Sequence, residues 1–430
     1  MPGPLAARFT LALRLLRAEG PRALVERWRD RRLDARRARR FAMVANGANG
    51  ADDGTGAVVA EARSPTLWVL PFPLQRRGGG AAIQLLVRLE ERALDEPVAV
   101  VQRLPGRWRC ELWGSGVTHP LAREWPIAGD LAPLLDPSPL PILTAAAAWV
   151  GARRIHFESL VDLPLTLPLA VQASGFEIGL SAHDFALFCP RPHLIEEPAG
   201  RFCEFSTEPM RCARCLAARW TLPPGFQEGR REVAARLAAA TSALEFPSEY
   251  MRREHLRLFP AIAAERTRVL PPRSLAEPLA PPLRAVLRPP RRIALAGAVH
   301  PHKGAREFEA VVAELAARRP GEYAWHVFGG GDPAALARLR RLPGTRVHGY
   351  YRAGSLPARL QAARIDLVLL PSIWPEAHCL VLDECAAAGI PVVAFDLGAL
   401  GERVRAGGMG VLVDPRAGAA GLAAAIADLR

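Results

Sequence analysis

The chain has 430 residues, half of them apolar, which is enough for two domains with hydrophobic cores of their own. Its formal net charge is +13, yet only one of its 56 basic residues, Lys303, is a lysine. The sequence has no run of ~18 uncharged apolar residues, which excludes a hydrophobic membrane-spanning helix. The arginine excess accompanies heavy alanine, leucine, glycine and proline usage, so it is a poor indicator of nucleic-acid binding.

The excess charge is concentrated in an N-terminal arm, residues 1–42, which holds twelve arginines and four acidic residues. The rest of the chain is nearly balanced, so we expect no nucleic-acid partner. Arginines interrupt the apolar residues of the arm, unlike the continuous apolar segment of a signal peptide. Two interpretations stay open: an amphipathic helix at an anionic membrane surface, and a solvated helical spacer. Residues 43–65 are rich in Gly, Asn and Asp, which predicts a flexible linker.

Strand-like and helix-like segments alternate after this linker, as in parallel α/β layers. Residues 66–270 are expected to form a first Rossmann-like domain, and the proline-rich residues 271–290 a linker between domains. Strands of the first domain are expected at 67–71, 97–101, 155–157 and 176–184.

Residues 291–430 alternate more regularly and predict a second, doubly wound Rossmann-like domain. Strands are expected at 292–297, 323–329, 345–350, 365–372, 391–396 and 409–415. The predicted fold class is therefore α/β, with two Rossmann-like domains facing each other across a cleft and a basic helical arm ahead of them. In such sheets ligands bind at the carboxyl ends of the strands.

Three loops at these carboxyl ends suit an anionic ligand: residues 298–304, 329–332 and 371–379. Lys303 begins a helix predicted over 303–318, which places an ammonium beside a positive helix end. Glu376 and Glu384 stand eight positions apart around the start of another helix. Such acids often only complement the helix dipole, but beside phosphate-binding helix ends they indicate a site for a nucleotide sugar.

The second half also carries a series of family motifs in order. They are Gly297 with Lys303-Gly304, the VFGGG of 327–331, the VHG of 347–349, the DLVLLPS of 366–372, the E-x7-E pair Glu376/Glu384, the AGIPVVA of 388–394 and the GVLV of 410–413. From Arg292 to Pro415 the chain thereby resembles the donor-binding half of the retaining family-4 (group 1) glycosyltransferases, which have the two-domain GT-B fold.

The resemblance implies that Lys303 contacts the donor diphosphate, Glu376 the transferred sugar and Glu384 the ribose hydroxyls. The residues it places around the donor are Gly297, Lys303, Gly304, Gly329, Gly330, Glu376, Ala377, His378, Cys379, Leu380 and Glu384. Two features depart from the family. An arginine common five or six positions before the lysine is replaced by Ala298 or Gly297, and Ala377-His378-Cys379 stands where a glycine-rich run is usual.

The first half resembles the family more loosely and supplies the acceptor side of the predicted cleft. The residues assigned there are Gly78, Gly79, Gly80, His156 and Asp184, with His183 joining Glu376 and Lys303 as a catalytic candidate near the reacting sugar. We favour function for His183 because it ends a strand on the carboxyl side. The alternative is a structural histidine bonded to the backbone.

An odd count of seven cysteines without a secretion signal predicts a protein of the reducing cytoplasm. If the arm binds lipid, the predicted location is the inner face of the cytoplasmic membrane. Cys189, Cys203, Cys212 and Cys215 have the spacing C-x13-C-x8-C-x2-C. Four such ligands suit a structural zinc ion, and free thiols are the alternative. By resemblance to GT-B enzymes, catalysis needs no metal or other cofactor.

The predicted activity is retaining transfer of a sugar from a nucleotide-sugar donor to a glycan or lipid-linked acceptor, as in surface polysaccharide or glycoconjugate biosynthesis. Two alternatives stay open: a nucleotide-sugar epimerase of the same fold, and a non-catalytic module that binds sugar nucleotides. A dinucleotide dehydrogenase is disfavoured for two reasons. The run Gly78–Gly80 lacks the third glycine of G-x-G-x-x-G, and no Asp or Glu stands at the end of the predicted strand 97–101.

Overall fold

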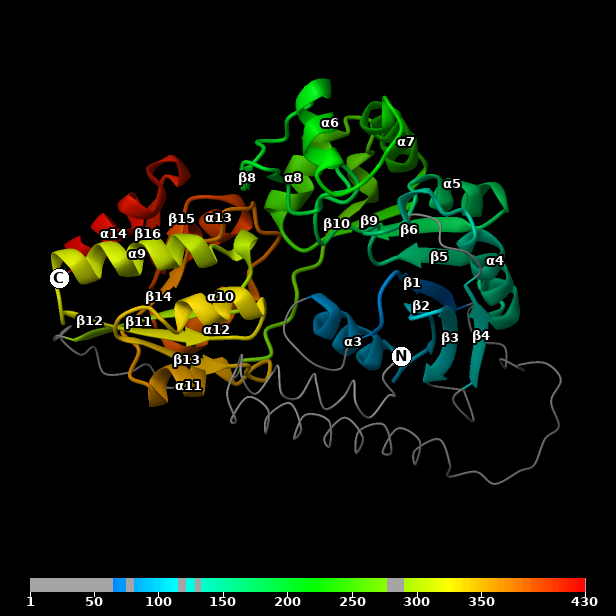
Figure 1. Cartoon of the computed structure of the whole chain (residues 1–430). Coiled ribbons are helices and arrows are strands. Elements are labelled where there is room, and N and C mark those ends of the chain that lie inside the picture. Colours follow the sequence, from blue (N-terminus) through cyan, green and yellow to red (C-terminus); the bar gives the residue numbers. More distant parts are fainter. Residues whose placement is uncertain (1–64, 75–80, 115–120, 128–132, 277–289, 430) are drawn as a thin grey trace, which may run out of the picture.

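The computed structural model describes residues 65–74, 81–114, 121–127, 133–276 and 290–429. They form two α/β domains, each built on its own sheet (Figure 1). The arm 1–42, nearly all of the linker 43–65 and most of the segment 271–290 lie outside the described residues, as do Gly78, Gly79 and Gly80. What the sequence predicts for them stays a prediction.

The N-terminal domain has an eight-stranded sheet in the order β10-β9-β6-β5-β1-β2-β3-β4. The strands from β10 to β2 run parallel, as predicted, but β3 and β4 are antiparallel to their neighbours. The bounds are β1 Thr66–Leu70, β2 Pro97–Leu104, β3 Arg107–Gly114, β4 Leu121–Pro126, β5 Arg154–Phe157, β6 Glu177–Ser181, β9 Ala243–Phe246 and β10 Thr267–Val269.

The antiparallel edge corrects the expectation of an all-parallel Rossmann-like domain. Trp108, Cys110 and Leu112 alternate with exposed or half-exposed residues along β3, and all three are buried. This two-residue period is that of a strand with one buried face. Pro105-Gly106 joins β2 to β3, and Gly106 has the left-handed φ of 74° that a tight hairpin turn requires. The alternation and the Pro-Gly pair are both visible in the sequence.

Helices cover both sheets, and a small two-stranded unit is added to the N-terminal domain (Figure 1). In the described residues no helix is both long and apolar enough to cross a membrane. The first domain holds α3 Ala81–Arg92, α4 Pro139–Val150, α5 Thr166–Ala173, α6 Pro209–Ala217, α7 Phe226–Ala240 and α8 Glu249–Leu258, with the hairpin β7 Ile195–Glu196 and β8 Arg201–Phe202.

The C-terminal domain has a six-stranded, fully parallel sheet in the order β13-β12-β11-β14-β15-β16. This is the doubly wound Rossmann order 3-2-1-4-5-6, so the prediction for this half is confirmed. The strands are β11 Arg291–Ala296, β12 Tyr323–Phe328, β13 Thr345–Gly349, β14 Leu367–Leu370, β15 Val392–Phe395 and β16 Gly410–Val413. The helices are α9 Ala305–Arg318, α10 Pro333–Leu339, α11 Leu356–Ala362, α12 Leu380–Ala388, α13 Gly398–Gly407 and α14 Gly418–Asp428.

The strand order reverses between β11 and β14, which is where such folds bind ligands. Lys303 lies in the connection after β11, and Glu376 lies in the connection after β14. The sequence predicted that Lys303 begins a helix, and the structure corrects this. Lys303 ends a short 3-10 turn, Pro301–Lys303, and α9 follows after Gly304.

The two domains contact each other through side chains of the C-terminal domain. Trp374, Ala377 and Ala399 pack into the hydrophobic core of the N-terminal domain. Arg253 on α8 pairs with Glu402 on α13. These contacts hold the loop after β14 and helix α13 against the first domain.

Candidate active site

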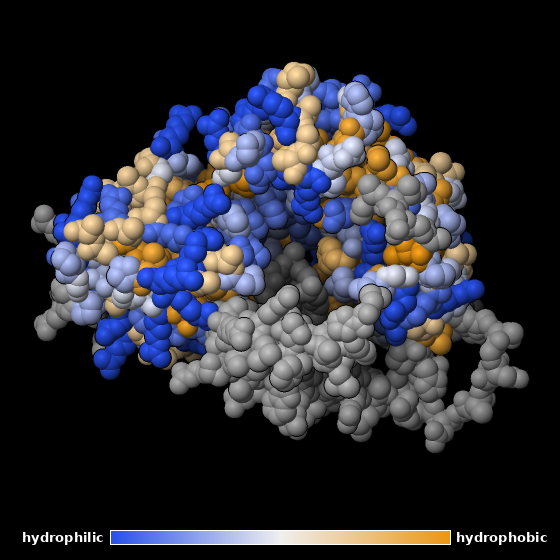
Figure 2. Space-filling view, in the orientation of Figure 1, coloured by the Kyte–Doolittle hydropathy of each residue, from blue (hydrophilic) through white to orange (hydrophobic). Residues whose placement is uncertain are grey.

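A cavity of about 940 Å³ lies between the domains, and the surface is hollowed where they meet (Figure 2). One wall is formed by the carboxyl-end loops of β11, β12 and β14, and the opposite wall by α3 and the loops after β6 and β9. Residues 270–275, which lead out of the first domain, line it as well. The cavity is large enough for a nucleotide-sized ligand.

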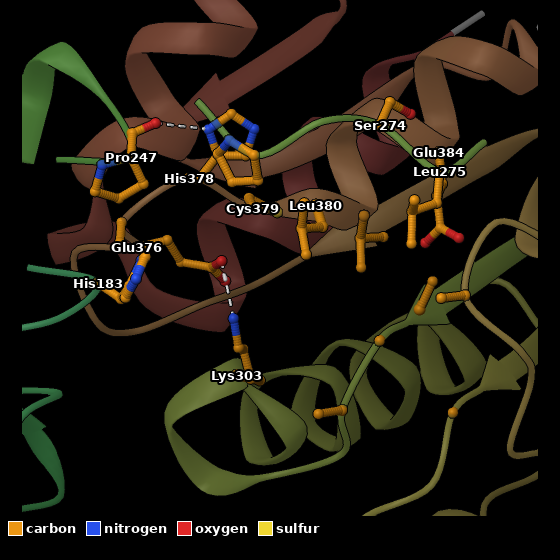
Figure 3. Close-up of a pocket in the computed structure, with 18 of the residues that line it drawn as sticks. His183, Pro247, Ser274, Leu275, Lys303, Glu376, His378, Cys379, Leu380 and Glu384 are labelled. Carbon is orange, nitrogen blue, oxygen red and sulfur yellow. Dashed lines mark hydrogen bonds and ion pairs between the residues drawn. The ribbon is translucent and has the colours of Figure 1, made fainter. Parts of the chain in front are cut away.

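An ion pair lies on the wall of this cavity. Lys303 Nζ lies 2.8 Å from Glu376 Oε2, and the two side chains reach toward each other from separate loops (Figure 3). Glu376 is 3% exposed, and the Ser372 hydroxyl donates to its other oxygen. Burial alone would raise the pKa of Glu376, but Lys303 and these hydrogen bonds outweigh it and hold the pKa below its usual value. Glu376 is therefore an ionised acceptor.

Lys303 keeps one side open to a ligand. Its side chain is 30% exposed and lines the cavity, and its ammonium lies 5.2 Å from the centre of the Trp374 ring. A cation above an aromatic face is stabilised without being surrounded. The ammonium can thus keep its contact with Glu376 and still attract an anion from the cavity.

Glu384 lines the far end of the cavity, on the first turns of α12 (Figure 3). Its carboxylate accepts the Gly354 N–H at 3.1 Å and the Tyr351 hydroxyl at 3.4 Å. Burial raises its pKa to about 7, and these two donors offset only part of that effect. The group therefore changes charge near neutral pH.

The loop ahead of α12 has an unusual backbone. Cys379 precedes the helix with φ 69°, in the left-handed region that favours glycine. His378 beside it contacts the Pro247 carbonyl through Nδ1 at 3.1 Å and Asp383 through Nε2 at 3.1 Å (Figure 3). His378 thereby ties the start of α12 to the N-terminal domain.

The N-terminal domain presents His183 to the cavity, held from behind by Glu158. His183 Nε2 lies 3.0 Å from Glu158 Oε2, and Arg88 on α3 pairs with the other oxygen of Glu158. Arg88 also contacts Glu245 at 3.2 Å. Burial by itself raises the pKa of Glu158, yet its hydrogen bond with His183 and the charge of Arg88 lower it to about 2. Glu158 is the carboxylate that orients His183.

Two further histidines stack across the domain boundary. The rings of His193 and His302 lie 3.9 Å apart and nearly parallel, and Trp374 meets His193 edge-on at 4.7 Å. Burial lowers the pKa of His193 to about 4 and that of His302 to about 2, with the charge of Lys303 adding to the effect in both. These rings are neutral at pH 7, so Lys303 is not joined there by a second cation.

The structure brings together most of the predicted site residues. Those that line the cavity are His183, Asp184, Gly297, Lys303, Gly329, Gly330, Glu376, Ala377, His378, Cys379, Leu380 and Glu384. The four predicted zinc ligands, Cys189, Cys203, Cys212 and Cys215, line a separate small cavity.

Two predicted residues stand elsewhere. His156 is 3% exposed, bonds to the Ser181 hydroxyl at 2.8 Å and packs on Trp68, so it does not line the cavity as the sequence suggested. Strand alternation turns its side chain into the domain. Gly304 is buried against Pro371 and does not line the cavity, so the structure does not place it at the donor site.

Several site residues were missed from the sequence. Glu158, Arg88 and His193 are among them, whereas Ser372 and Trp374 lie in the predicted loop 371–379 but were assigned no role. Glu158 directly follows β5, so the rule that pointed to His183 also applied to it. Arg88 had no such signal, because its role depends on where α3 packs.

Two α/β domains, one on a mixed sheet and one on a fully parallel sheet, with a ligand-sized cavity between them have the architecture of the GT-B class. Residues 290–430 match the family described as glycosyl transferases group 1. The match covers the C-terminal domain alone, and this half of the chain is thereby similar to group 1 glycosyltransferases. No curated protein matches the chain.

Solved structures of the same fold are more distant in sequence. Sucrose-phosphate synthase from Thermosynechococcus elongatus has a TM-score of 0.59 and 20% identity, over 85% of this chain and 89% of that one. HepE from Anabaena, in complex with UDP and glucose, has a TM-score of 0.51 and 18% identity, over 84% of this chain and 88% of that one. WaaG, a glycosyltransferase involved in lipopolysaccharide biosynthesis, has a TM-score of 0.50 and 15% identity, over 84% of this chain and 89% of that one. These likenesses confirm the GT-B fold.

We predict that Gly304→Ala lowers the free energy of unfolding by more than the backbone strain of placing alanine at a left-handed position. Gly304 has φ 81°, and an added Cβ would collide with the Pro371 carbonyl. Gly321 has the same φ with open space around it, so Gly321→Ala measures only the backbone strain, about 1–2 kcal/mol. The comparison is made by urea denaturation. Equal losses for the two variants would contradict the packing of the Lys303 turn against Pro371.

We also predict that Glu158→Gln lowers the free energy of unfolding at pH 7 by about 2–3 kcal/mol. The variant should then lose less stability than the wild type when the pH is lowered into the acid range. The folded pKa of Glu158 lies below its unfolded value of 4.5, so its contribution is present above that pH and disappears as the pH falls toward about 2. The matched control is Glu177→Gln, which breaks an exposed pair with Arg154 and is expected to cost less than about 1 kcal/mol. Urea unfolding at several pH values tests both.

Proposed function

We propose that the chain transfers a sugar, with retention of anomeric configuration, from a nucleotide-sugar donor to a glycan or lipid-linked acceptor. The observation that carries the proposal is the Lys303–Glu376 pair at the switch point of the C-terminal sheet, inside the cavity between the domains. The donor would occupy the C-terminal side and the acceptor the N-terminal side. Surface polysaccharide or glycoconjugate biosynthesis is the process we propose, in the cytoplasm or at the inner face of its membrane.

Lys303 is proposed to bind the donor diphosphate. A phosphate drawn to its ammonium would also meet the backbone of Gly329 and Gly330 and the positive end of α12, which begins beside Cys379 at the cavity. As the bond to the sugar breaks, negative charge grows on the departing diphosphate. Fixed positive groups at that place stabilise the transition state more than the ground state. The proposed mechanism uses no catalytic metal.

Glu376 and His183 are proposed to hold the reacting sugar. Glu376 is ionised and accepts hydrogen bonds, as sugar hydroxyl groups require. His183 lies across the cavity near Glu376 (Figure 3). Since Glu158 engages its Nε2, Nδ1 is the ring nitrogen left for a ligand. The acceptor would then attack from the face on which the diphosphate leaves.

Glu384 is proposed to accept hydrogen bonds from the ribose hydroxyls. It lines the same cavity as Lys303, from helix α12. Two donors already orient its carboxylate, Gly354 and Tyr351. A nucleotide that spans from Lys303 to Glu384 would place its sugar beside Glu376.

We predict that Lys303→Ala reduces kcat roughly 10²–10³-fold, the usual loss when one group that stabilises a transition-state charge is removed. Lys303→Arg keeps the charge but replaces a compact ammonium by a planar fork, and should stay at least about tenfold below wild type. Arg306→Ala is the matched control. Arg306 is an exposed cation one turn further on that does not line the cavity.

The assay uses the nucleotide sugar that raises the melting temperature most in a panel with UDP, GDP and ADP controls. Product formed only with acceptor present supports a transferase, whereas conversion of donor alone would support an epimerase. Wild-type turnover in Lys303→Ala, or an equal loss in Arg306→Ala, would contradict the assignment.

We predict that donor affinity increases from pH 6 to pH 8 because Glu384, with a pKa of about 7, must be ionised to accept the ribose hydroxyls. If only the carboxylate binds, the change in Kd over this range is about tenfold. Glu384→Gln should weaken binding and remove the pH dependence. Calorimetric titration with an intact nucleotide sugar measures this without the titration of a terminal phosphate. A pH-independent wild-type Kd would refute the role.

A further inference from the structure

Four of the seven cysteines surround one small cavity in the N-terminal domain, away from the cleft. Cys189, Cys203, Cys212 and Cys215 all line a space of about 30 Å³. A single water-sized particle needs only ~10–15 Å³. All four are free cysteines, and Cys215 is the most buried of them. Four residues between 189 and 215 thus place soft ligands on the wall of one small space.

The segment that carries these cysteines has only short elements of secondary structure. Strands β7 and β8 have two residues each, and α6 has nine (Figure 1). Cys189 precedes the hairpin, Cys203 follows it directly, and Cys212 and Cys215 lie three apart on one face of α6. Leu194, Phe202 and Phe205 pack the segment onto the core of the N-terminal domain. A metal held by the four cysteines would add a cross-link within it.

Backbone N–H groups point at three of the four sulfurs. Cys189 accepts from the Arg191 N–H, Cys203 from those of Phe205 and Ser206, and Cys215 from that of Glu197 at 3.4 Å. The chain turns back on Cys203 through two non-glycine residues in the left-handed region, Glu204 at φ 54° and Phe205 at φ 57°. Burial raises the pKa of Cys189 to about 12 and also raises that of Cys203, and the N–H donors offset only part of this effect. The same donors are placed to stabilise the sulfurs once a metal has displaced their protons.

Cationic side chains complete the environment. Arg231 Nη2 lies 3.3 Å from Cys212 Sγ, and Arg211, also at the cavity, is paired with Glu196. Four thiolates around a divalent ion carry a net charge of −2. Arg231 and the backbone donors are placed to offset that charge.

We propose that Cys189, Cys203, Cys212 and Cys215 bind one Zn²⁺ as a tetrahedral tetrathiolate site. Each sulfur forms a bond to the ion and each thiol proton passes to solvent, four in all, with no change of oxidation state. Among the described residues no three His, Cys, Asp or Glu side chains already stand in the arrangement of a metal site. Binding therefore includes the movement of the four sulfurs from the cavity wall onto the ion.

The site would act on the cleft through the loop between Cys189 and Cys203. That loop carries His193, which lines the large cavity and stacks on His302. Arg191 in the same loop donates to the Cys215 carbonyl at 2.9 Å. Zinc would thus fix one wall of the cleft from outside it. The proposal does not depend on the proposed function, because metal content is measured without any assay of transfer.

The first experiment measures zinc in the full-length protein after expression with zinc and extensive dialysis, by mass spectrometry of the metal. About one zinc per chain is expected for the wild type. Cys212→Ala and Cys215→Ala, singly and together, should lose it. Cys110→Ala is the control: it removes a buried thiol of β3 outside the cluster and should keep zinc. Zinc retained by the double variant would overturn the proposal.

The second experiment uses the wild type alone, so it stays decisive if the variants fail to fold. Titration of the metal-free protein with Co²⁺ should give the intense thiolate-to-cobalt absorption and visible bands of a tetrahedral tetrathiolate site. Bound Zn²⁺ should protect four of the seven cysteines from alkylation under native conditions, and EDTA should expose them. Absence of the cobalt bands, or the same alkylation pattern with and without zinc, would refute the site.

Discussion

The buried carboxylate of Glu376 and the single lysine of the chain constrain the whole cleft. An ionised carboxylate at 3% exposure is costly without a cation, and Lys303 supplies that cation at 2.8 Å. The two residues come from loops after β11 and β14, which are neighbours in the sheet with fixed register. The order of the strands therefore creates the ion pair, and the ion pair in turn fixes both loops where they line the cavity.

The cavity also depends on contacts that cross the domain boundary. His378 holds the start of α12 against the Pro247 carbonyl, and His193 stacks on His302 beside Lys303. Trp374 packs into the core of the first domain while its ring faces the lysine ammonium. Residues that surround the proposed diphosphate site therefore also join the domains. Any relative movement of the domains would change the surroundings of Lys303.

The departures from the family pattern have a structural counterpart. Cys379 occupies a left-handed position that glycine adopts without strain, a cost of order 1–2 kcal/mol for a residue with a side chain. Its backbone still leads α12 into the cavity wall. The cation missing before Lys303 is not replaced by His302, because burial and the neighbouring charges keep that ring neutral. The lysine is left as the cation of this loop, with the helix end of α12 beside it.

Local pattern was enough to determine the C-terminal domain and most of its site. Apolar runs between glycine turns specify strands such as Leu367–Leu370, and parallel strands bring Lys303 and Glu376 to one edge whatever else the chain does. Only the tertiary structure decided how neighbours meet. The strand pleat turned His156 inward, the packing of α3 brought Arg88 to Glu158, and the antiparallel pair β3–β4 completed the first sheet. These outcomes depend on which side chain faces which element, and such non-local contacts are not written in the spacing of residues along the chain.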